Sequence, residues 1–449
     1  MTLQATPEDL FTLLRAEREG AWLGRVFVSP EGVERVRGMQ SVILVGADGV
    51  GKTALMEYLK GQSLHNPAGP LMVWWRPVPL PAPDALQSVN GFREQAFQET
   101  SIAALDWAGR FPHLVKQAPQ YAQRSWVACV DAFIPPFQQE RLLYEYPVLR
   151  ELLSDLRARV DQTFSALFSI PSLDVLRAWV DALRAMGCLG VWVVVDGLEM
   201  WQSPESDALL VQMKHLLSSM VWFEQAGFAL KILAPERFQK VLLSAIKPEN
   251  KRIQPAMLIW SVEKLKEIVE CRLHWITGKP EPTLETLVQD GFLLTVLKQY
   301  GGMLPRGWLD LTYPFVKAYL EKKSPLTMAE GEQILRKYPP RLRLDLQRKR
   351  VILGYSVWEV SPQSYDLLEY LYRQPDFSCT KEELYYRGIR RYENIPAPGS
   401  KEWEPPSDWW GVMDTALWRL RREIERDPGN PLYILSERRK GMVRLNWLW

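Results

Sequence analysis

Cysteine is scarce in this sequence of 449 residues, and its four cysteines lie far apart. They lack the close spacing of zinc ligands and of thioredoxin-type redox motifs. We therefore expect buried, reduced thiols, as in a cytosolic protein. The four positions are Cys129, Cys188, Cys271 and Cys379.

Long apolar runs are also missing. The longest, residues 191–195, is far short of the roughly 20 apolar residues that a membrane-spanning helix needs. No secretory signal is visible at the start of the sequence. We expect no membrane partner and a cytoplasmic location.

An excess of charge of either sign is absent as well. Lys and Arg number 55 against 53 Asp and Glu, so a polyanionic partner would have to bind at a local basic patch. Hydrophobic residues make up 47% and charged residues 24%, which is typical of a folded protein and excludes a wholly disordered or collagen-like chain. At roughly 100–200 residues per domain, the length suggests about three domains.

Short apolar, β-branched runs predict strands at 41–45, 71–75, 190–195 and 228–233. Such runs are typical of strands buried on both faces of a parallel sheet. A proline-rich linker follows the second run, and a structureless loop as long as the remaining stretch is improbable in a compact domain. We predict an α/β domain over residues 1–255 with a helical insertion at about 84–185.

Two further regions follow this domain. Residues 256–336 have helical periodicity, and Ser261 can cap a helix with one apolar face. From 342 to 346 leucines alternate with polar residues, the signature of a half-buried strand. We predict a helical subdomain over 256–336 and a separate domain over 338–449.

The strongest motif is G-A-D-G-V-G-K-T, which follows the first predicted strand and matches the P-loop pattern G-x-x-x-x-G-K-[ST]. Gly46, Gly49 and Gly51 would let backbone N–H groups curl around phosphates at a helix N-terminus. Lys52 would reach the β and γ phosphates, and Thr53 would hold Mg²⁺. The motif predicts ATP and Mg²⁺ as cofactors.

The third predicted strand ends in an acid. Asp196 directly follows it and would bind Mg²⁺ through the water shell of the ion. Glu199, three residues later, could orient or deprotonate the attacking water, with Lys52 stabilising the phosphates. The alternatives are a turn acid at 196 and a surface glutamate at 199. An ATPase acting as a switch is the expected enzyme activity.

These motifs, with the helical region behind them, make residues 20–330 resemble the AAA+ and STAND classes of P-loop NTPases. The resemblance implies a sensor after the fourth strand, where Arg237 is available. It also implies a G-x-P-R element that touches the nucleotide. Here Gly302 precedes Pro305 and Arg306 with one extra residue, so these two are candidate nucleotide contacts, and an ordinary loop is the alternative. No arginine finger is assigned.

The C-terminal region predicts three helices and a hairpin. Ser361 and Pro362 begin the first helix, and Thr380 with Glu383 forms a capping box for the second. The third has an apolar face and an opposite face rich in arginine, and a hairpin with a basic tip follows it. The side chains predicted to bind DNA are Thr415, Arg419, Arg422 and Arg426 on the helix and Arg438, Arg439 and Lys440 at the tip.

Three helices with a basic third helix and a basic hairpin indicate a winged helix bound to duplex DNA. Residues 340–449 resemble the OmpR/PhoB-type output domain, with an additional proline-rich insertion at about 390–410. Glu423, Glu425 and Glu437 are expected to dilute the basic patch. A winged helix used for protein contacts is the alternative.

The whole chain is therefore predicted to be α/β: a P-loop NTPase with a parallel sheet and helical insertion, a helical subdomain, and a C-terminal α+β winged helix. The leading hypothesis is a nucleotide-switched transcriptional regulator that binds double-stranded DNA and hydrolyses ATP slowly. The second is an AAA+ DNA-remodelling ATPase such as an initiator, loader or transposition regulator. The third is a STAND-type signalling or defence protein. Self-association and a protein signal are further expected partners.

Overall fold

The computed structural model describes residues 11, 22–77, 85–160, 162–198, 211, 217, 225–245, 253–437 and 441–446. They form two compact units, one within Arg15–Trp260 and the other containing Ser261–Trp449. The sequence placed the first boundary at 255, but strand β5 (Ile253–Met257) still pairs with the sheet of the first unit.

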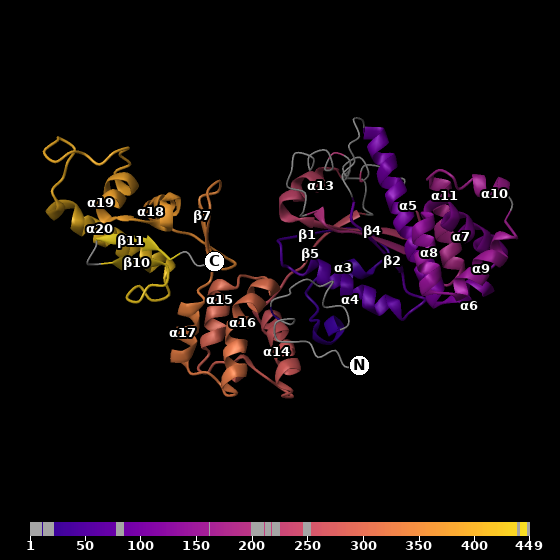
Figure 1. Ribbon diagram of the computed structural model, residues 1–449, viewed down its shortest axis with the longest axis horizontal. Coiled ribbons are helices and arrows are strands. Elements are labelled where there is room, and N and C mark those ends of the chain that lie inside the picture. The colour runs from indigo at the N-terminus through magenta and orange to yellow at the C-terminus, as the bar shows by residue number, and fades with distance from the viewer. Residues whose placement is uncertain are drawn as a thin grey trace. The chain divides into compact units, whose positions relative to one another are not determined.

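The first unit is built on a five-stranded parallel sheet with the order β2-β3-β4-β1-β5 (Figure 1). Four strands lie where the sequence predicts them. The fifth was missed because Ile253–Met257 contains a proline and a glutamine and pairs with β1 alone, at the edge of the sheet. The other strands are β1 (Ser41–Gly46), β2 (Leu71–Trp75), β3 (Val191–Val195) and β4 (Phe228–Pro235).

Helices fill the connections between the strands. Helix α4 follows the P-loop. Along the chain, seven described helices connect β2 to β3, where the sequence predicts a helical insertion (Figure 1). The helices are α3 (Glu34–Arg37), α4 (Lys52–Leu64), α5 (Ala85–Arg110), α6 (Pro112–Gln117), α7 (Gln120–Phe133), α8 (Pro136–Glu145), α9 (Val148–Arg157), α10 (Gln162–Ala166), α11 (Leu173–Ala185), η3 (Glu236–Phe238) and α13 (Gln239–Ala245).

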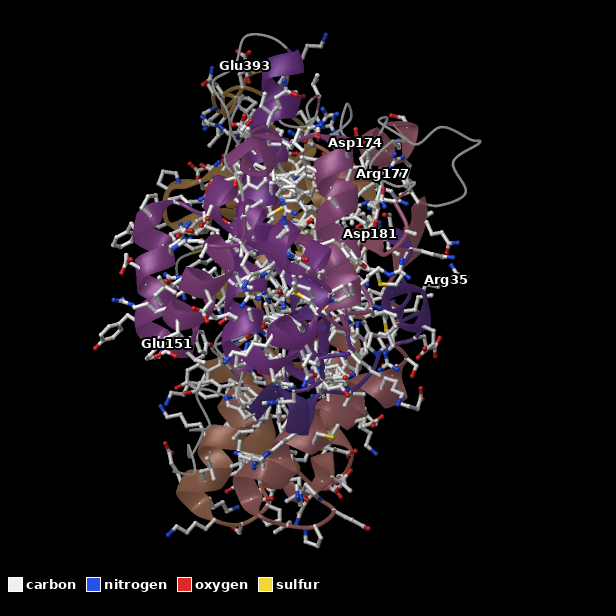
Figure 2. All side chains as sticks on the ribbon, turned by 90° about the vertical axis from the view of Figure 1, so that its right-hand side faces the viewer. Arg35, Glu151, Asp174, Arg177, Asp181 and Glu393 are labelled. Atoms are coloured by element: carbon white, nitrogen blue, oxygen red, sulfur yellow. The ribbon has the colours of Figure 1, made fainter. Side chains whose placement is uncertain are left out.

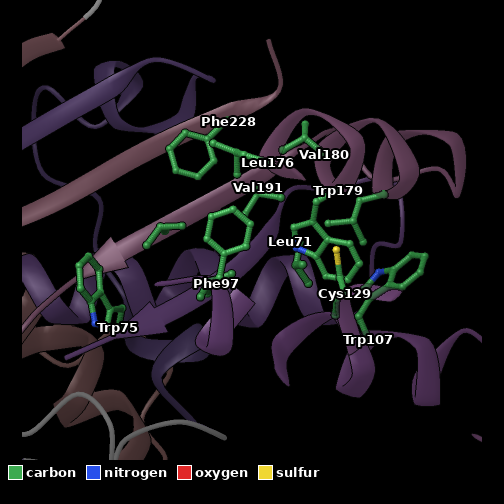
Figure 3. Packing of buried hydrophobic residues seen from close by; sticks show 14 of the residues in the cluster. Leu71, Trp75, Phe97, Trp107, Cys129, Leu176, Trp179, Val180, Val191 and Phe228 are labelled. Carbon is green, nitrogen blue, oxygen red and sulfur yellow. The ribbon is translucent and has the colours of Figure 1, made fainter. Parts of the chain in front are cut away.

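The insertion shares one hydrophobic core with the sheet. Trp179 of α11 and Cys129 of α7 are fully buried, and Figure 3 shows them beside Leu71 and Val191 of the sheet. Phe97 of α5 lies in the same cluster. Because these side chains pack together, the insertion is part of the first unit and does not form a core of its own.

Helix α11 shows how the sequence pattern produces this packing. Its Asp174, Arg177 and Asp181 are exposed and project outward (Figure 2). They recur at three- and four-residue spacing, so they share the face opposite the buried Trp179 and Leu183. The helix begins at Ser172, whose hydroxyl accepts a hydrogen bond from the N–H of Val175.

The second unit begins with the helical subdomain. Ser261 caps α14 by accepting from the N–H of Lys264, as the sequence predicts. Thr327 and Glu330 form a capping box at the last helix. The elements are α14 (Val262–Thr277), η4 (Leu284–Thr286), α15 (Phe292–Tyr300), α16 (Pro305–Lys322) and α17 (Met328–Lys337).

The C-terminal part of the second unit is an α+β winged helix. A three-stranded antiparallel sheet precedes three helices, and a second three-stranded sheet with the order β10-β11-β9 forms the wing. The elements are β6 (Leu342–Asp345), β7 (Arg350–Leu353), β8 (Ser356–Trp358), α18 (Pro362–Arg373), η5 (Pro375–Phe377), β9 (Ser378–Thr380), α19 (Lys381–Glu383), the π-helical η6 (Leu384–Ile389), α20 (Pro406–Ile424), β10 (Ile434–Glu437) and β11 (Met442–Leu445).

The predicted helix starts in this part are confirmed. Ser361 accepts from the N–H of Ser364 with Pro362 at the first helical position, and Thr380 and Glu383 form the capping box. The short strand β9 was not predicted, because its residues directly precede the second helix. The predicted α/β class is confirmed. Among the described helices, none has the length and apolarity needed to cross a membrane.

One charged side chain is buried inside the first unit. Lys231 on β4 is 1% exposed, and its ammonium donates to the backbone oxygens of Gly38 and Gln40, both at 2.7 Å. It also lies 4.7 Å from the centre of the Trp192 ring. Burial lowers the pKa of Lys231 to about 7. The ammonium joins the loop before β1 to the centre of the sheet.

We predict that stability of the first unit rises between about pH 7 and pH 10. The folded protein holds the Lys231 proton less tightly than the unfolded chain, so unfolding takes up a proton in that window. The slope for one proton is at most about 1.4 kcal/mol per pH unit. Lys231→Met should lack this contribution, so its stability relative to the wild type should fall as the pH rises.

Thermal melting from pH 6.5 to pH 10 measures this difference. Lys240→Met, at an exposed position of α13, is the matched control. A stability difference between Lys231→Met and the wild type that stays constant with pH would show that Lys231 keeps its proton throughout.

Candidate functional site

The P-loop connects β1 to α4. Gly49 and Gly51 have φ of +85° and +97°, values that favour glycine. A Cβ at Gly46 would lie 2.8 Å from Val50 Cγ1, so the turn leaves little room for a side chain there. The turn between β1 and α4 therefore favours glycine at 49 and 51 through its backbone angles and at 46 through lack of space.

Lys52 opens helix α4 and folds back over the loop. Its ammonium donates to the backbone oxygens of Gly46 at 2.8 Å and Ala47 at 3.2 Å, and the side chain is 8% exposed. Trp260 also contacts the loop, because its indole N–H donates to the backbone oxygen of Val50 at 2.8 Å. No local sequence pattern signals this role of Trp260, because it lies more than 200 residues from the loop in the chain.

Thr53 and Asp196 come together although they are far apart in the sequence. The Thr53 hydroxyl donates to Asp196 Oδ2 at 3.4 Å, and Asp196 is 3% exposed. Asp196 directly follows β3, and its other carboxylate oxygen accepts from the N–H of Gly197. The two oxygen-bearing side chains that the sequence proposed for Mg²⁺ therefore meet at one edge of the sheet.

The donors present fit a magnesium nucleotide. Mg²⁺ prefers oxygen ligands and usually keeps waters and substrate phosphates with one or two protein oxygens. Thr53 and Asp196 provide such oxygens beside the N-terminus of α4, where the positive helix end and Lys52 favour phosphate. Thr53 and Asp196 would hold the ion, and Lys52 would exchange a loop carbonyl for phosphate oxygen.

Three further charged residues follow strands of the sheet. Glu199 lies outside the described residues. Arg237 lies just past β4, exposed, with its guanidinium 4.7 Å from the centre of the Phe238 ring. Arg76, which the sequence reasoning missed, follows β2, and its side chain lies 3.6 Å from a Cβ built on Gly197. Arg76 is thus a cation next to the Asp196 turn.

Pro305 and Arg306 lie at the start of α16, in the second unit. There the turn at Gly302 packs against the turn between β7 and β8. Tyr355 donates its N–H to the oxygen of Tyr300 at 2.7 Å, and Gly302 donates its N–H to Ser356 Oγ at 3.0 Å. A Cβ at Gly302 would lie 2.6 Å from the oxygen of Tyr355. We call this contact the junction.

Charged groups complete the junction. The Tyr355 hydroxyl donates to the Asp310 carboxylate. Burial raises the pKa of Asp310, against the opposing effects of this hydrogen bond and of the nearby Arg306 guanidinium. Tyr300 also stacks on Trp358, with ring centres 6.1 Å apart. The element predicted to touch nucleotide is therefore packed directly onto the winged helix.

The predicted DNA-binding helix is α20. Its Leu417, Leu420 and Ile424 are buried, whereas Thr415 and Arg419 are exposed, as is Arg422. The two faces are thus arranged as the periodicity predicts. The side chains Arg438, Arg439 and Lys440 at the wing tip lie outside the described residues, although the flanking strands β10 and β11 form the predicted hairpin.

Arg426 was predicted on the same helical face, and that placement is wrong. The helix ends at Ile424, Glu425 is extended, and the Arg426 guanidinium lies 4.4 Å from the centre of the Phe292 ring in the helical subdomain. The periodicity could not reveal this, because it contains no signal for the helix end.

The expectation that three acids dilute the basic patch is wrong for Glu425. It is 5% exposed and accepts three backbone N–H groups, at 2.7–2.8 Å, from residues 432–434. Glu423 turns toward α18, where its carboxylate accepts from the N–H and hydroxyl of Ser361 but stays partly exposed. Glu437 remains exposed on β10. The Glu425 carboxylate therefore lies inside the fold and not on the surface that carries the arginines.

No protein-family model and no curated protein matches the sequence. Among solved structures, the chain is similar to the Aeropyrum pernix ORC2 protein in ADPNP–ADP complexes, with 13% identity and a TM-score of 0.35. The match covers 95% of this chain and 93% of that one. The fold assignment rests on the strand order and loop geometry of this chain itself.

We predict that Thr53→Ala abolishes the effect of Mg²⁺ on ATP affinity. Titrating a fluorescent ATP analogue with Mg²⁺ and with EDTA measures it. Wild-type protein should bind more tightly with Mg²⁺, whereas Thr53→Ala should bind equally in both. Lys52→Ala should lose about tenfold or more under both conditions, or about 1.4 kcal/mol.

Lys60→Ala, at a partly exposed lysine on the same helix, is the control for Lys52→Ala and should bind like the wild type. Full Mg²⁺ dependence in Thr53→Ala would exclude Thr53 as a ligand of the ion.

Proposed function

We propose that this protein is an AAA+-type ATPase whose nucleotide state controls how its winged helix engages double-stranded DNA. The outward face of α20 carries the DNA part of the proposal, since Arg419 and Arg422 are exposed while Glu423 and Glu425 are bonded elsewhere. The P-loop with Thr53 and Asp196 at one edge of the sheet supports the nucleotide part.

The nucleotide part works through a few side chains. Lys52 would release its loop carbonyls to pair with phosphate oxygens, and Thr53 and Asp196 would hold a magnesium ion, whose charge would offset that of the phosphates. Glu199 would orient the attacking water. Pro305 and Arg306 are the further nucleotide contacts that the AAA+ and STAND resemblance implies. ATP and ADP then differ by the contacts of the γ-phosphate, and that difference can shift a conformational equilibrium.

The junction links the helical subdomain, which would respond to ATP or ADP, to the winged helix, which would bind DNA. Because Gly302 and Asp310 of the helical subdomain contact Ser356 and Tyr355 of the winged helix, a nucleotide-driven movement of the subdomain would move the winged helix with it. A direct mechanical connection suits a DNA-remodelling or initiator-type ATPase. We place this class first.

A transcriptional regulator is the second candidate. The three-stranded sheet β6-β7-β8 precedes α18, which is the order expected of an OmpR/PhoB-type output domain. The remodelling class predicts DNA-stimulated ATP turnover and ATP-dependent assemblies. A regulator should hydrolyse ATP slowly and without stimulation by DNA, and ATP should change only its affinity for DNA.

We predict that duplex affinity depends on ATP and falls with salt, because arginines replace counterions on the phosphates. Gel-shift titrations at several salt concentrations, with ATP, ADP and no nucleotide, measure this. Arg419→Ala with Arg422→Ala should weaken binding and reduce the salt slope by about one for each lost phosphate contact. Lys52→Ala should remove the difference between ATP and ADP.

Arg177→Ala, an exposed arginine on α11, is the matched control and should bind DNA like the wild type. Retention of full DNA affinity in the Arg419/Arg422 double variant would favour a winged helix that contacts protein. Identical binding with ATP, with ADP and without nucleotide would refute nucleotide control.

The junction makes a separate prediction. Tyr355→Phe keeps the ring but removes the hydrogen bond to the half-buried Asp310 carboxylate, which should cost about 1–3 kcal/mol of stability in the second unit. ATP affinity should be unchanged, whereas the ratio of DNA affinities with ATP and ADP should move toward one. Calorimetry and the same gel-shift titration measure these quantities.

Tyr338→Phe, a tyrosine that is 49% exposed at the end of the helical subdomain, is the control. An unchanged ratio in Tyr355→Phe would show that the nucleotide signal does not pass through this hydrogen bond.

A further inference from the structure

Helix α20 leaves a tryptophan at the centre of its outward face. Residues on an α-helix are separated by about 100°, so the buried Met413, Leu420 and Ile424 define the inward direction. Trp418 and Arg422 lie opposite them. Sequence reasoning selected the polar residues of this face and passed over Trp418.

Trp418 differs in exposure from Trp409, which lies near the start of the same helix. Its side chain is 52% exposed, whereas Trp409 is 3% exposed and packs inside the winged helix. The Arg422 guanidinium lies 4.7 Å from the centre of the Trp418 ring. Such a cation–π contact holds the guanidinium in place and leaves its N–H groups available at the ring edge.

The nearby charges favour a polyanion against this pair. Arg419 is exposed one residue beyond Trp418. Asp414, one turn before it, forms an ion pair with Lys381 at 2.5 Å, and Glu423 is bonded to Ser361. The two acids closest to the pair along the helix are thus engaged, while both arginines face outward.

We propose that Trp418 and Arg422 together read bases in the major groove, with the indole against the C5-methyl group of a thymine and the guanidinium on a neighbouring guanine. This inference rests on the proposed binding of duplex DNA. The major groove is about 12 Å wide and admits an α-helix, and the thymine methyl is the apolar feature that it displays. Arginine pairs with guanine O6 and N7. A flat, exposed indole beside a fixed guanidinium provides both contacts at one base step.

The experiment replaces thymine by deoxyuridine, which lacks only the C5-methyl group. The probe is the tightest duplex selected from a random pool by the full chain with ATP and Mg²⁺. One substituted duplex is made for each thymine. For the wild type, one substitution should weaken binding by about fourfold, the affinity equivalent of one buried methylene-sized group. Trp418→Ala should bind the thymine and uracil duplexes equally.

Trp410→Ala is the matched control, because Trp410 is 41% exposed on the same helix but contacts Lys381 instead of an arginine. It should keep the fourfold methyl effect. Trp418→Phe should retain part of the effect, which separates loss of the contact from loss of folding, and ATP affinity should match the wild type in every variant.

The outcomes separate the inference from the proposed function. If the wild type does not bind duplex DNA at all, the proposed function fails. If the wild type binds but no thymine shows a methyl effect, or if Trp418→Ala keeps it, base reading by Trp418 is refuted while DNA binding stands. Equal enrichment of all sequences in the selection also refutes it. A methyl effect that disappears only in the Trp418 variants supports it.

Discussion

The parallel register of the central sheet is the constraint on which the candidate nucleotide site depends. Val45 pairs with Ala234 of β4, and Val195 pairs with Ile232 of the same strand, so β1 and β3 end at the same edge although β4 lies between them. That edge brings Thr53 within hydrogen-bonding distance of Asp196. The insertion strengthens the arrangement, because its side chains pack into the same core as β2 and β3. A long helical segment can therefore be inserted between two strands without disturbing the site that they form.

The winged helix depends on a different interaction, in which backbone N–H groups donate hydrogen bonds to carboxylates. Burial raises the pKa of Glu425, and the hydrogen bonds from residues 432–434 oppose that effect. These bonds fix the chain that leads from α20 into β10. Arg421 adds to them by donating to the oxygen of Ile434 and to Ser436 Oγ. The same contacts that fasten the wing also hold the Glu425 carboxylate inside the fold, away from the surface that carries Arg419 and Arg422.

Much of this architecture follows from local sequence patterns, and the remainder depends on long-range contacts. The strands around the P-loop, the caps at Ser261 and Ser361, and the two faces of α20 each carry a signal within a few residues. Strand β5 carries none, because an edge strand with a proline lacks the alternation that identifies strands. Other contacts join residues far apart in the chain. They are the contact of Trp260 with the P-loop, the hydrogen bonds of Glu423 and the contact of Arg426 with the helical subdomain. No periodicity encodes such partners.

The junction is a contact between two backbone turns of the second unit. Gly302 and Gly354 both have positive φ, and a Cβ on either would lie 2.6 Å from a backbone oxygen of the opposing turn. The two turns therefore approach through their backbones, which leaves little room for sliding. A side-chain contact could adjust by changing rotamer, but a backbone contact of this kind transmits a displacement. Arg306 lies one turn before Asp310 on α16, and Asp310 accepts the hydrogen bond of Tyr355, so a displacement at the start of α16 would reach the turn between β7 and β8.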